Sequence, residues 1–254
     1  MATMSEETTK KDFSKLYTPG AIIFAGLLVG GGLFFGLSHG SSAPAAAGNA
    51  ANGQQQPAQA VNIKDVKTDG DPYIGQANAP IALAAWEDFQ CPFCRAVEVG
   101  NPQIPTAPAM PDLIKQYVDT GKLKIVFKDF EFLGPDSLVD AEWARAVWDL
   151  YPSQYLAWRT AMFNQQPQEN SLSAADNLAH VKKVTASISG IDVAKVAAQV
   201  AAKQSLYDAA IQADQQEGAS FGITGTPAFI TGTTEIDGAQ PLSAFQSAIG
   251  AQLK

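Results

Sequence analysis

Short apolar runs and amphipathic segments alternate from residue 69 to the end of the chain. The run at 81–86 predicts a buried strand, and the segment 122–127 predicts another, because alternation there gives way to continuous apolar residues. Pro92 should begin a helix between them, since proline at the first helical position loses no hydrogen bond. A second helical piece is expected at 112–120. This order of elements predicts two parallel strands joined by a right-handed crossover.

A long helical region is expected from about 137 to 216. Two apolar stripes recur at helix spacing, one of Ala141, Trp143, Ala144, Val147 and Trp148 and the other of Val193, Val196, Ala197 and Val200. Such stripes normally face a protein core. Asn170-Ser171 and Ser189-Gly190 are expected to separate the helices.

Strand patterns return near the C-terminus. Residues 228–230 and 234–236 flank a turn at 231–233 that contains a glycine, which is typical of a β-hairpin. Pro241 should then begin a last amphipathic helix. The pattern predicts an α/β fold made of a βαβ half, a helical insertion and a ββα half.

The N-terminal region has the pattern of a membrane anchor. Residues 1–20 are polar and include three lysines, whereas residues 21–38 contain no charged side chain. An apolar span of roughly 17–20 residues can cross a bilayer as a single helix. The lysines before it place the N-terminus in the cytoplasm and the rest of the chain outside. A signal peptide cleaved near 45–47 is the alternative, and it also exports the domain.

Residues 39–68 are expected to form a flexible linker that leads to a folded domain at 69–254. The stretch from 38 to 60 contains no Lys, Arg, Asp or Glu and consists mainly of Ser, Ala, Gly, Asn, Gln and Pro. Such a composition cannot bury a core of its own. The fold should begin between Val61 and Pro72.

Charge argues against a nucleic-acid partner. The formal net charge is −8, and no run of Lys or Arg is longer than two residues. An acidic chain without a basic patch repels the phosphate backbone. We therefore expect no nucleic-acid partner.

The chain has two cysteines, Cys91 and Cys94. A bridge between them would close a very small loop and would stabilise the fold little, so the pair favours chemistry over architecture. Cys91 stands just before the expected helix, where unpaired N–H groups and the helix dipole should lower its pKa below the usual value of about 8.5. We expect Cys91 to be the exposed, attacking thiol and Cys94 the buried, resolving one. Pro92 and Phe93 between them add no charge.

A zinc site is the competing interpretation of the cysteine pair. Two cysteines supply only half of a tetrahedral set, and the two histidines, His39 and His180, have no motif spacing to them. We therefore expect no metal and no other cofactor. An inert pair of buried thiols is disfavoured because the two cysteines follow a strand and open a helix.

Two segments carry a resemblance to a known family. Glu87-Asp88-Phe89-Gln90-Cys91-Pro92-Phe93-Cys94 resembles the active-site segment of DsbA-like thioredoxin-fold proteins, and Gly225-Thr226-Pro227-Ala228-Phe229 resembles their cis-proline loop. The similarity covers roughly residues 70–254. It implies a thioredoxin fold with a helical insertion, a cis Pro227 packed against the cysteines, and a Thr226 backbone that pairs with an extended substrate.

The sequence departs from this family at one position. Many relatives carry an acidic residue six positions before the first cysteine, where it helps to move the proton of the second thiol. Here that position is Ala85. Glu87 and Asp88 are nearby, but we expect them at the strand end facing solvent and assign neither as the proton acceptor.

The resemblance implies an extracytoplasmic thiol–disulfide oxidoreductase that oxidises exported proteins. A membrane quinone reductase of the DsbB or vitamin-K-epoxide-reductase type would reoxidise it, by analogy. A reductase or isomerase is the first alternative. A non-enzymatic, membrane-anchored scaffold that binds extended chains is the second, and its function would survive Cys91→Ser. Acyl transfer is not supported, since the chain has no Gly-x-Ser-x-Gly motif.

Overall fold

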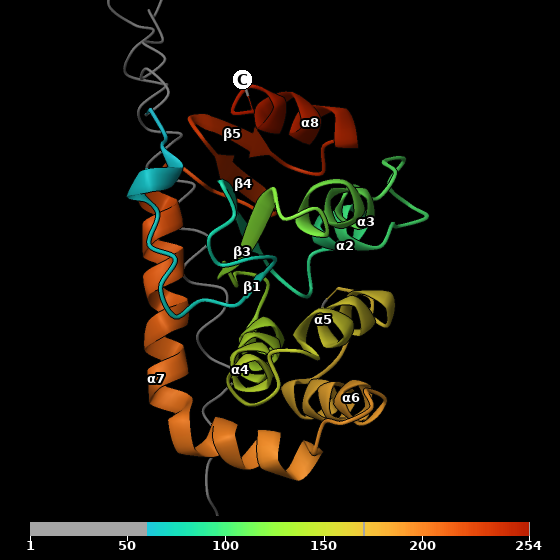
Figure 1. Ribbon diagram of the computed structural model, residues 1–254. Helices are drawn as coiled ribbons and strands as arrows, with labels where there is room; N and C mark the ends of the chain where they lie inside the picture. Colours follow the sequence, from blue (N-terminus) through green and yellow to red (C-terminus); the bar gives the residue numbers. More distant parts are fainter. Residues whose placement is uncertain (1–59, 170, 254) are drawn as a thin grey trace, which may run out of the picture. The chain divides into compact units, whose positions relative to one another are not determined.

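The computed structural model describes residues 60–169 and 171–253, which contain a five-stranded sheet in the order β1-β3-β2-β4-β5 (Figure 1). Its strands are β1 (Tyr73–Ile74), β2 (Ile81–Glu87), β3 (Leu123–Asp129), β4 (Ala228–Thr231) and β5 (Thr234–Asp237). β2 and β3 are parallel, as predicted, and the other neighbouring strands are antiparallel. The expected hairpin is confirmed in β4 and β5. The short edge strand β1 was not expected.

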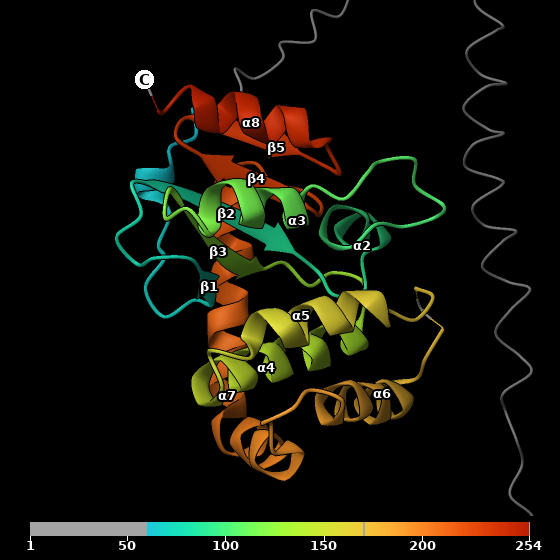
Figure 2. The same cartoon turned by 45° about the vertical axis from the view of Figure 1, so that its right-hand side comes forward.

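Helices surround this sheet. They are α2 (Pro92–Glu98), α3 (Met110–Leu113) with its π-helical continuation η2 (Ile114–Val118), α4 (Pro135–Leu150), α5 (Tyr155–Asn164), α6 (Ala174–Ala186), α7 (Val193–Ser220) and α8 (Leu242–Gly250), preceded by the 3-10 turn η1 (Ile63–Asp65). The predicted helical region thus comprises α4 to α7, between the two halves of the sheet. Its α4, α5 and α6 lie at the end of the domain opposite α8 (Figure 2).

The breaks between these helices were only partly foreseen. Ser189-Gly190 separates α6 from α7, as expected, and Gly190 has a φ of 86°. A further break at 151–154 separates α4 from α5 and was missed, although Pro152 stands there and proline ends a helical pattern. Residue 170 lies outside the described part of the chain.

Alternation along β2 divides the core into two layers. Leu83 and Ala85 face the larger core, together with residues of α2, α3, α8 and the helical insertion. Ala84 and Trp86 point to the opposite face, where the end of α7 and the segment before β1 cover them. Both faces of β2 are therefore buried, which explains why the strand reads as a continuous apolar run.

The domain begins earlier than residue 69. Val61 and Val66 are buried in the smaller core, and the Ile63 N–H donates to the Gly232 carbonyl at 2.8 Å. These residues lie in the stretch 39–68 that was assigned to the linker, so burial of their side chains corrects that boundary, and it agrees with the expectation that the fold begins between Val61 and Pro72. The expected tail and anchor, residues 1–38, lie outside the described residues. In the described part of the chain, no helix is both long enough and apolar enough to span a bilayer.

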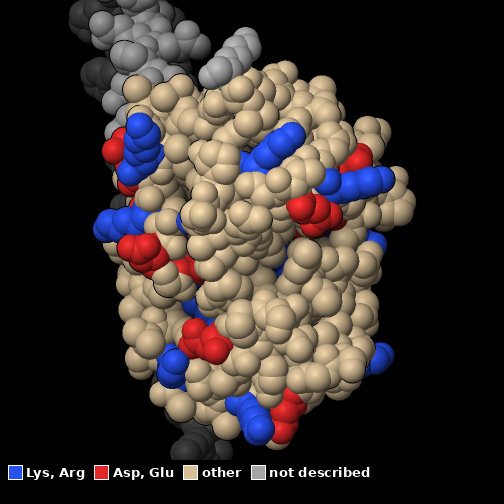
Figure 3. Space-filling model, in the orientation of Figure 1, with Lys and Arg blue, Asp and Glu red and all other residues tan. Residues whose placement is uncertain are grey.

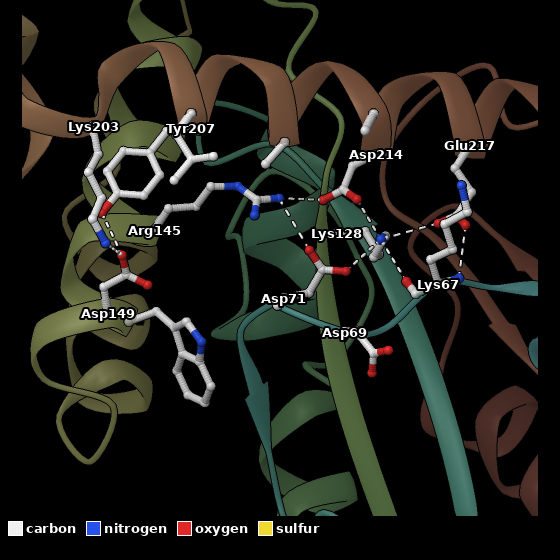
Figure 4. A pocket seen from close by; sticks show the side chains of 15 residues that line it. Lys67, Asp69, Asp71, Lys128, Arg145, Asp149, Lys203, Tyr207, Asp214 and Glu217 are labelled. Atoms are coloured by element: carbon white, nitrogen blue, oxygen red, sulfur yellow. Dashed lines mark hydrogen bonds and ion pairs between the residues drawn. The ribbon is translucent and has the colours of Figure 1, made fainter.

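A buried ion network ties β3 to α4, α7 and the segment before β1 (Figure 4). The Lys128 ammonium lies 2.6 Å from Asp71 and 2.5 Å from Asp214, and the Arg145 guanidinium lies 2.5 Å from Asp129 and 2.6 Å from Asp214. A cavity of about 400 Å³ lies beside it. On the surface shown in Figure 3, basic side chains mostly lie next to acidic ones, and no patch of one sign forms.

Candidate active site

The end of β2 and the start of α2 bring the two cysteines into one place. Cys91 is the N-cap residue of α2 and has an extended backbone, and Pro92 occupies the first helical turn as predicted. Both thiols are free. The Cys91 N–H donates to the Asp88 carbonyl at 3.0 Å, and the Cys91 carbonyl accepts the first helical hydrogen bond from Arg95 at 3.1 Å. Cys94 therefore lies one turn into the helix, directly behind Cys91.

The two thiols have opposite acidities. The pKa of Cys91 is lowered to about 7, chiefly by hydrogen bonding from the Cys94 thiol and against the effect of burial, with further help from the N–H groups of Phe93 and Cys94. Burial raises the pKa of Cys94 well above its usual value, and the negative charges of Cys91 and Glu87 raise it further. The expected lowering of the Cys91 pKa is confirmed in direction, but the Cys94 thiol lowers it more than the N–H groups of the helix do.

One expectation about exposure was wrong. Cys91 is only 3% exposed, and Cys94 is fully buried. Phe93, one of the two residues between the cysteines, is instead half exposed. The chain covers Cys91 because a loop 135 residues away reaches it: the Thr226 carbonyl oxygen lies 3.4 Å from the Cys91 sulfur. The Thr226–Pro227 peptide bond is cis, as the resemblance implied.

Side chains from outside the motif hold this segment in position. The Gln166 side-chain amide, just after α5, donates to the carbonyls of Phe89 at 2.7 Å and Cys91 at 2.9 Å. The Asp88 carboxylate accepts from the N–H groups of Gln90 at 2.8 Å and Phe132 at 3.2 Å. Gln90 in turn donates to the buried Asp140 of α4 at 2.5 Å. The helical insertion therefore fixes the path of the active-site turn.

Glu87 and Asp88 are both buried, which corrects the expectation that they face solvent. Glu87 pairs with Arg159 of α5, and Arg159 also binds Glu98, the last residue of α2, at 3.1 Å. The guanidinium lies 3.9 Å from the centre of the Phe127 ring. This buried arginine joins β2, α2 and α5 beneath the cysteines.

Sequence reasoning missed most of these supporting residues. Glu87 left a usable signal, because Leu83, Ala85 and Glu87 alternate along one strand and must share a face. No such signal exists for Arg159, Gln166 and Asp140, because the sequence around each of them does not indicate which distant element it contacts. Among residues 60–169 and 171–253, no group of three or more His, Cys, Asp or Glu side chains converges as a metal site would.

Comparison with known proteins agrees with this geometry. The thioredoxin family matches residues 67–251. The disulfide bond formation protein D of Bacillus subtilis is 29% identical over 98 residues, which are 39% of this chain and 40% of that relative. The chain therefore matches about two fifths of the length of that curated relative.

Solved structures share the architecture. Oxidised BdbD from Bacillus subtilis superimposes with a TM-score of 0.64 at 18% identity, covering 77% of this chain and 98% of that one. DsbA from Chlamydia trachomatis superimposes with a TM-score of 0.61 at 17% identity, covering 73% and 93%. The chain belongs to the thioredoxin family, and within it has the fold of the DsbA-like thiol–disulfide oxidoreductases.

Proposed function

We propose that this protein is a disulfide oxidase that acts outside the cytoplasm through a Cys91–Cys94 redox pair. The observation that carries the proposal is the asymmetry of the two thiols. Cys91 has a pKa of about 7 and adjoins the Thr226 loop, whereas Cys94 is fully buried and its pKa is raised. Thiol–disulfide exchange needs one sulfur that leaves readily as a thiolate and one that stays protected.

The exchange follows from this arrangement. A substrate thiolate attacks the Cys91 sulfur of the oxidised pair, the bond to Cys94 breaks, and a mixed disulfide forms. A second substrate thiolate then attacks the substrate sulfur, and Cys91 leaves as a thiolate, which its low pKa favours. Two electrons pass from the substrate to the cysteine pair. Thr226 would hold the substrate backbone as an added strand, and the half-exposed Phe93 between the two cysteines offers an apolar contact.

One observation favours electron transfer from the substrate to the cysteine pair, as in an oxidase, and another favours transfer in the opposite direction, as in a reductase. The name of the Bacillus subtilis relative, disulfide bond formation protein D, favours the oxidase. A Cys91 pKa of about 7 favours the reductase, because it matches the value of about 7 for thioredoxin rather than about 3.5 for DsbA. Reduction is therefore the second candidate function, and the reduction potential separates the two.

The proposed location rests on the sequence and on the relatives. Residues 1–20 would form a cytoplasmic tail, residues 21–38 a single anchor, and the following residues a tether to the exported domain. The substrates would be reduced exported proteins. A DsbB-like or vitamin-K-epoxide-reductase-like quinone reductase in the same membrane would accept the electrons.

The reduction potential of residues 60–254, equilibrated in glutathione buffers and measured by thiol trapping, tests this function. Reference values are about −120 mV for DsbA and −270 mV for thioredoxin. A potential near the oxidising value supports the oxidase and the quinone-linked partner. A potential near the reducing value favours the reductase. Absence of a reversible couple would remove both enzyme functions.

A further inference from the structure

Three charged side chains form a closed group beneath the redox pair: Glu87, Glu98 and Arg159. The Arg159 guanidinium contacts both carboxylates, and the exposed fractions of the three side chains are 3%, 1% and 3% in that order. The rings of Phe89, Phe127 and Phe163 pack around the guanidinium at 3.9 to 5.1 Å. The group is therefore shielded from bulk solvent and counter-ions.

The charges of this group do not balance. One arginine faces two carboxylates, so full ionisation would leave a net charge of −1 buried among aromatic rings. An uncompensated buried charge is costly, and such a site keeps a proton instead. One carboxyl oxygen of Glu87, Oε1, accepts no hydrogen bond from the described residues. Burial raises the pKa of Glu87 well above its usual value despite the opposing effect of Arg159, and Glu98 raises it further.

Helix and strand geometry place both carboxyl groups on faces that adjoin the core around Cys94. Glu98 follows Cys94 by four residues in α2, so the two side chains share one face of the helix. Glu87 ends β2 on the same strand face as Ala85, toward the core that contains both cysteines. Burial raises the pKa of Cys94 first, and the Glu87 charge raises it further, so the carboxyl and the sulfur interact.

We propose that Glu87 is the proton donor and acceptor for Cys94, that burial and Glu98 keep the exchanged proton on Glu87, and that Arg159 stabilises the carboxylate left when the proton moves. This assignment rests on the proposed exchange reaction. When a thiolate attacks Cys91, the sulfur–sulfur bond breaks and its electron pair goes to the Cys94 sulfur. The Glu87 carboxyl gives its proton to that sulfur, directly or through one water. The carboxylate then pairs with Arg159, and it takes the proton back when Cys94 attacks during reoxidation.

The test is single-turnover reduction of the oxidised full-length chain by dithiothreitol, followed by acid quench and thiol trapping across a range of pH. Glu87→Gln should slow the reaction at least about tenfold and remove the carboxyl titration from its pH profile, since a positioned acid contributes roughly 10²–10⁴-fold. The amide copies the shape and charge of the protonated carboxyl, so Arg159 keeps a balanced partner in Glu98 and the fold should persist. Glu131→Gln is the matched control, because its carboxyl oxygens are also buried without partners.

Infrared spectra of the oxidised proteins give a second readout. The wild type should show a protonated-carboxyl band at neutral pH that Glu87→Gln lacks. In Glu98→Gln the group is a neutral pair, so the Glu87 band should titrate at lower pH. Equal reduction rates, or equal carboxyl bands, in wild type and Glu87→Gln would overturn the proposal. Dithiothreitol reduces the pair whichever way the protein works in the cell, so failure of the oxidase function would leave this test valid.

Discussion

The Cys91 sulfur lies 3.4 Å from the backbone carbonyl oxygen of Thr226, although the two residues are 135 positions apart. The carbonyl accepts a hydrogen bond from the protonated thiol but offers nothing to the thiolate. Cys94 contributes most to lowering the pKa of Cys91, and the Thr226 side chain and the N–H groups of Phe93 and Cys94 contribute further. The reactivity of the site therefore depends on both α2 and the loop that contains Thr226.

The acidity of Cys91 should depend on Cys94. The rate of alkylation of the reduced protein by iodoacetamide is expected to rise with pH around a midpoint of about 7. Cys94→Ala removes the strongest donor to the thiolate, so the midpoint should move upward. Cys94→Ser keeps an O–H donor and should move it less. An unchanged midpoint in Cys94→Ala would show that the helix terminus alone activates Cys91.

The two cysteines should differ as trapping variants. With Cys94 changed to Ala, Cys91 forms mixed disulfides that cannot be resolved within the enzyme. A peptide activated as a mixed disulfide should therefore stay attached to Cys94→Ala and be seen by intact-mass spectrometry. Cys91→Ala leaves only a thiol that is fully buried with a raised pKa, and it should capture at least about tenfold less. Equal capture by both variants would contradict the assigned roles.

Lys128 should be a major source of stability. Its side chain is 2% exposed and contacts Asp71, Asp214 and Glu217. Lys128→Met would remove one of the two cations that the buried Asp71 and Asp214 share with Arg145, and we expect a loss of about 3–5 kcal/mol in the free energy of unfolding by urea. Lys203 pairs with Asp149 at 2.9 Å but is 42% exposed. Lys203→Met is the matched control and should cost no more than about 1 kcal/mol.

Asp140 should make stability depend on pH. Burial raises its pKa to about 7 in the folded protein, while hydrogen bonds from Asn177 and Gln90 oppose the shift. The unfolded value is about 3.9, so between about pH 4 and pH 7 the folded state binds more protons and this residue's contribution to stability falls as pH rises. The fall should total at most about 4 kcal/mol.

Urea unfolding across this pH window checks the contribution of Asp140. Asp140→Asn should flatten the decline of stability with pH relative to wild type, because its side chain does not titrate. Asp65→Asn, at an exposed position, should leave the wild-type slope unchanged. The same slope of unfolding free energy against pH in wild type and Asp140→Asn would refute the raised pKa of Asp140.

Gly218 should be required by close packing. A Cβ atom there would lie 3.0 Å from the Trp86 ring and 3.2 Å from Phe130. Gly218→Ala gains helix propensity of about 1 kcal/mol, but crowding in a packed core costs about 1–3 kcal/mol. We expect a net loss of up to about 2 kcal/mol in thermal or urea unfolding. Gly250, with nothing within 4 Å of an added Cβ, is the control, and Gly250→Ala should be neutral or slightly stabilising.

Much of the secondary structure follows from local patterns. The apolar run at 81–86 and the proline at 92 predicted β2 and α2 because strand alternation and helix starts depend on residues a few positions apart. The break at 151–154 was missed because the apolar stripe continues on both sides of it. The edge strand β1 was missed because two residues carry no period, and only pairing with β3 makes them a strand.

The amino-acid sequence by itself determined that two cysteines open a helix after a buried strand, and hence that one thiol is activated. Only the tertiary structure decided how strongly that thiol is activated and how much of it is exposed. It buried Cys91 beneath the Thr226 loop, turned Glu87 inward and brought Arg159 from α5 to meet it. The physical reason is the difference in the distances over which these interactions act. Helix and strand preferences act between near neighbours, whereas burial and charge pairing depend on distance in space, which packing sets for residues far apart in the chain.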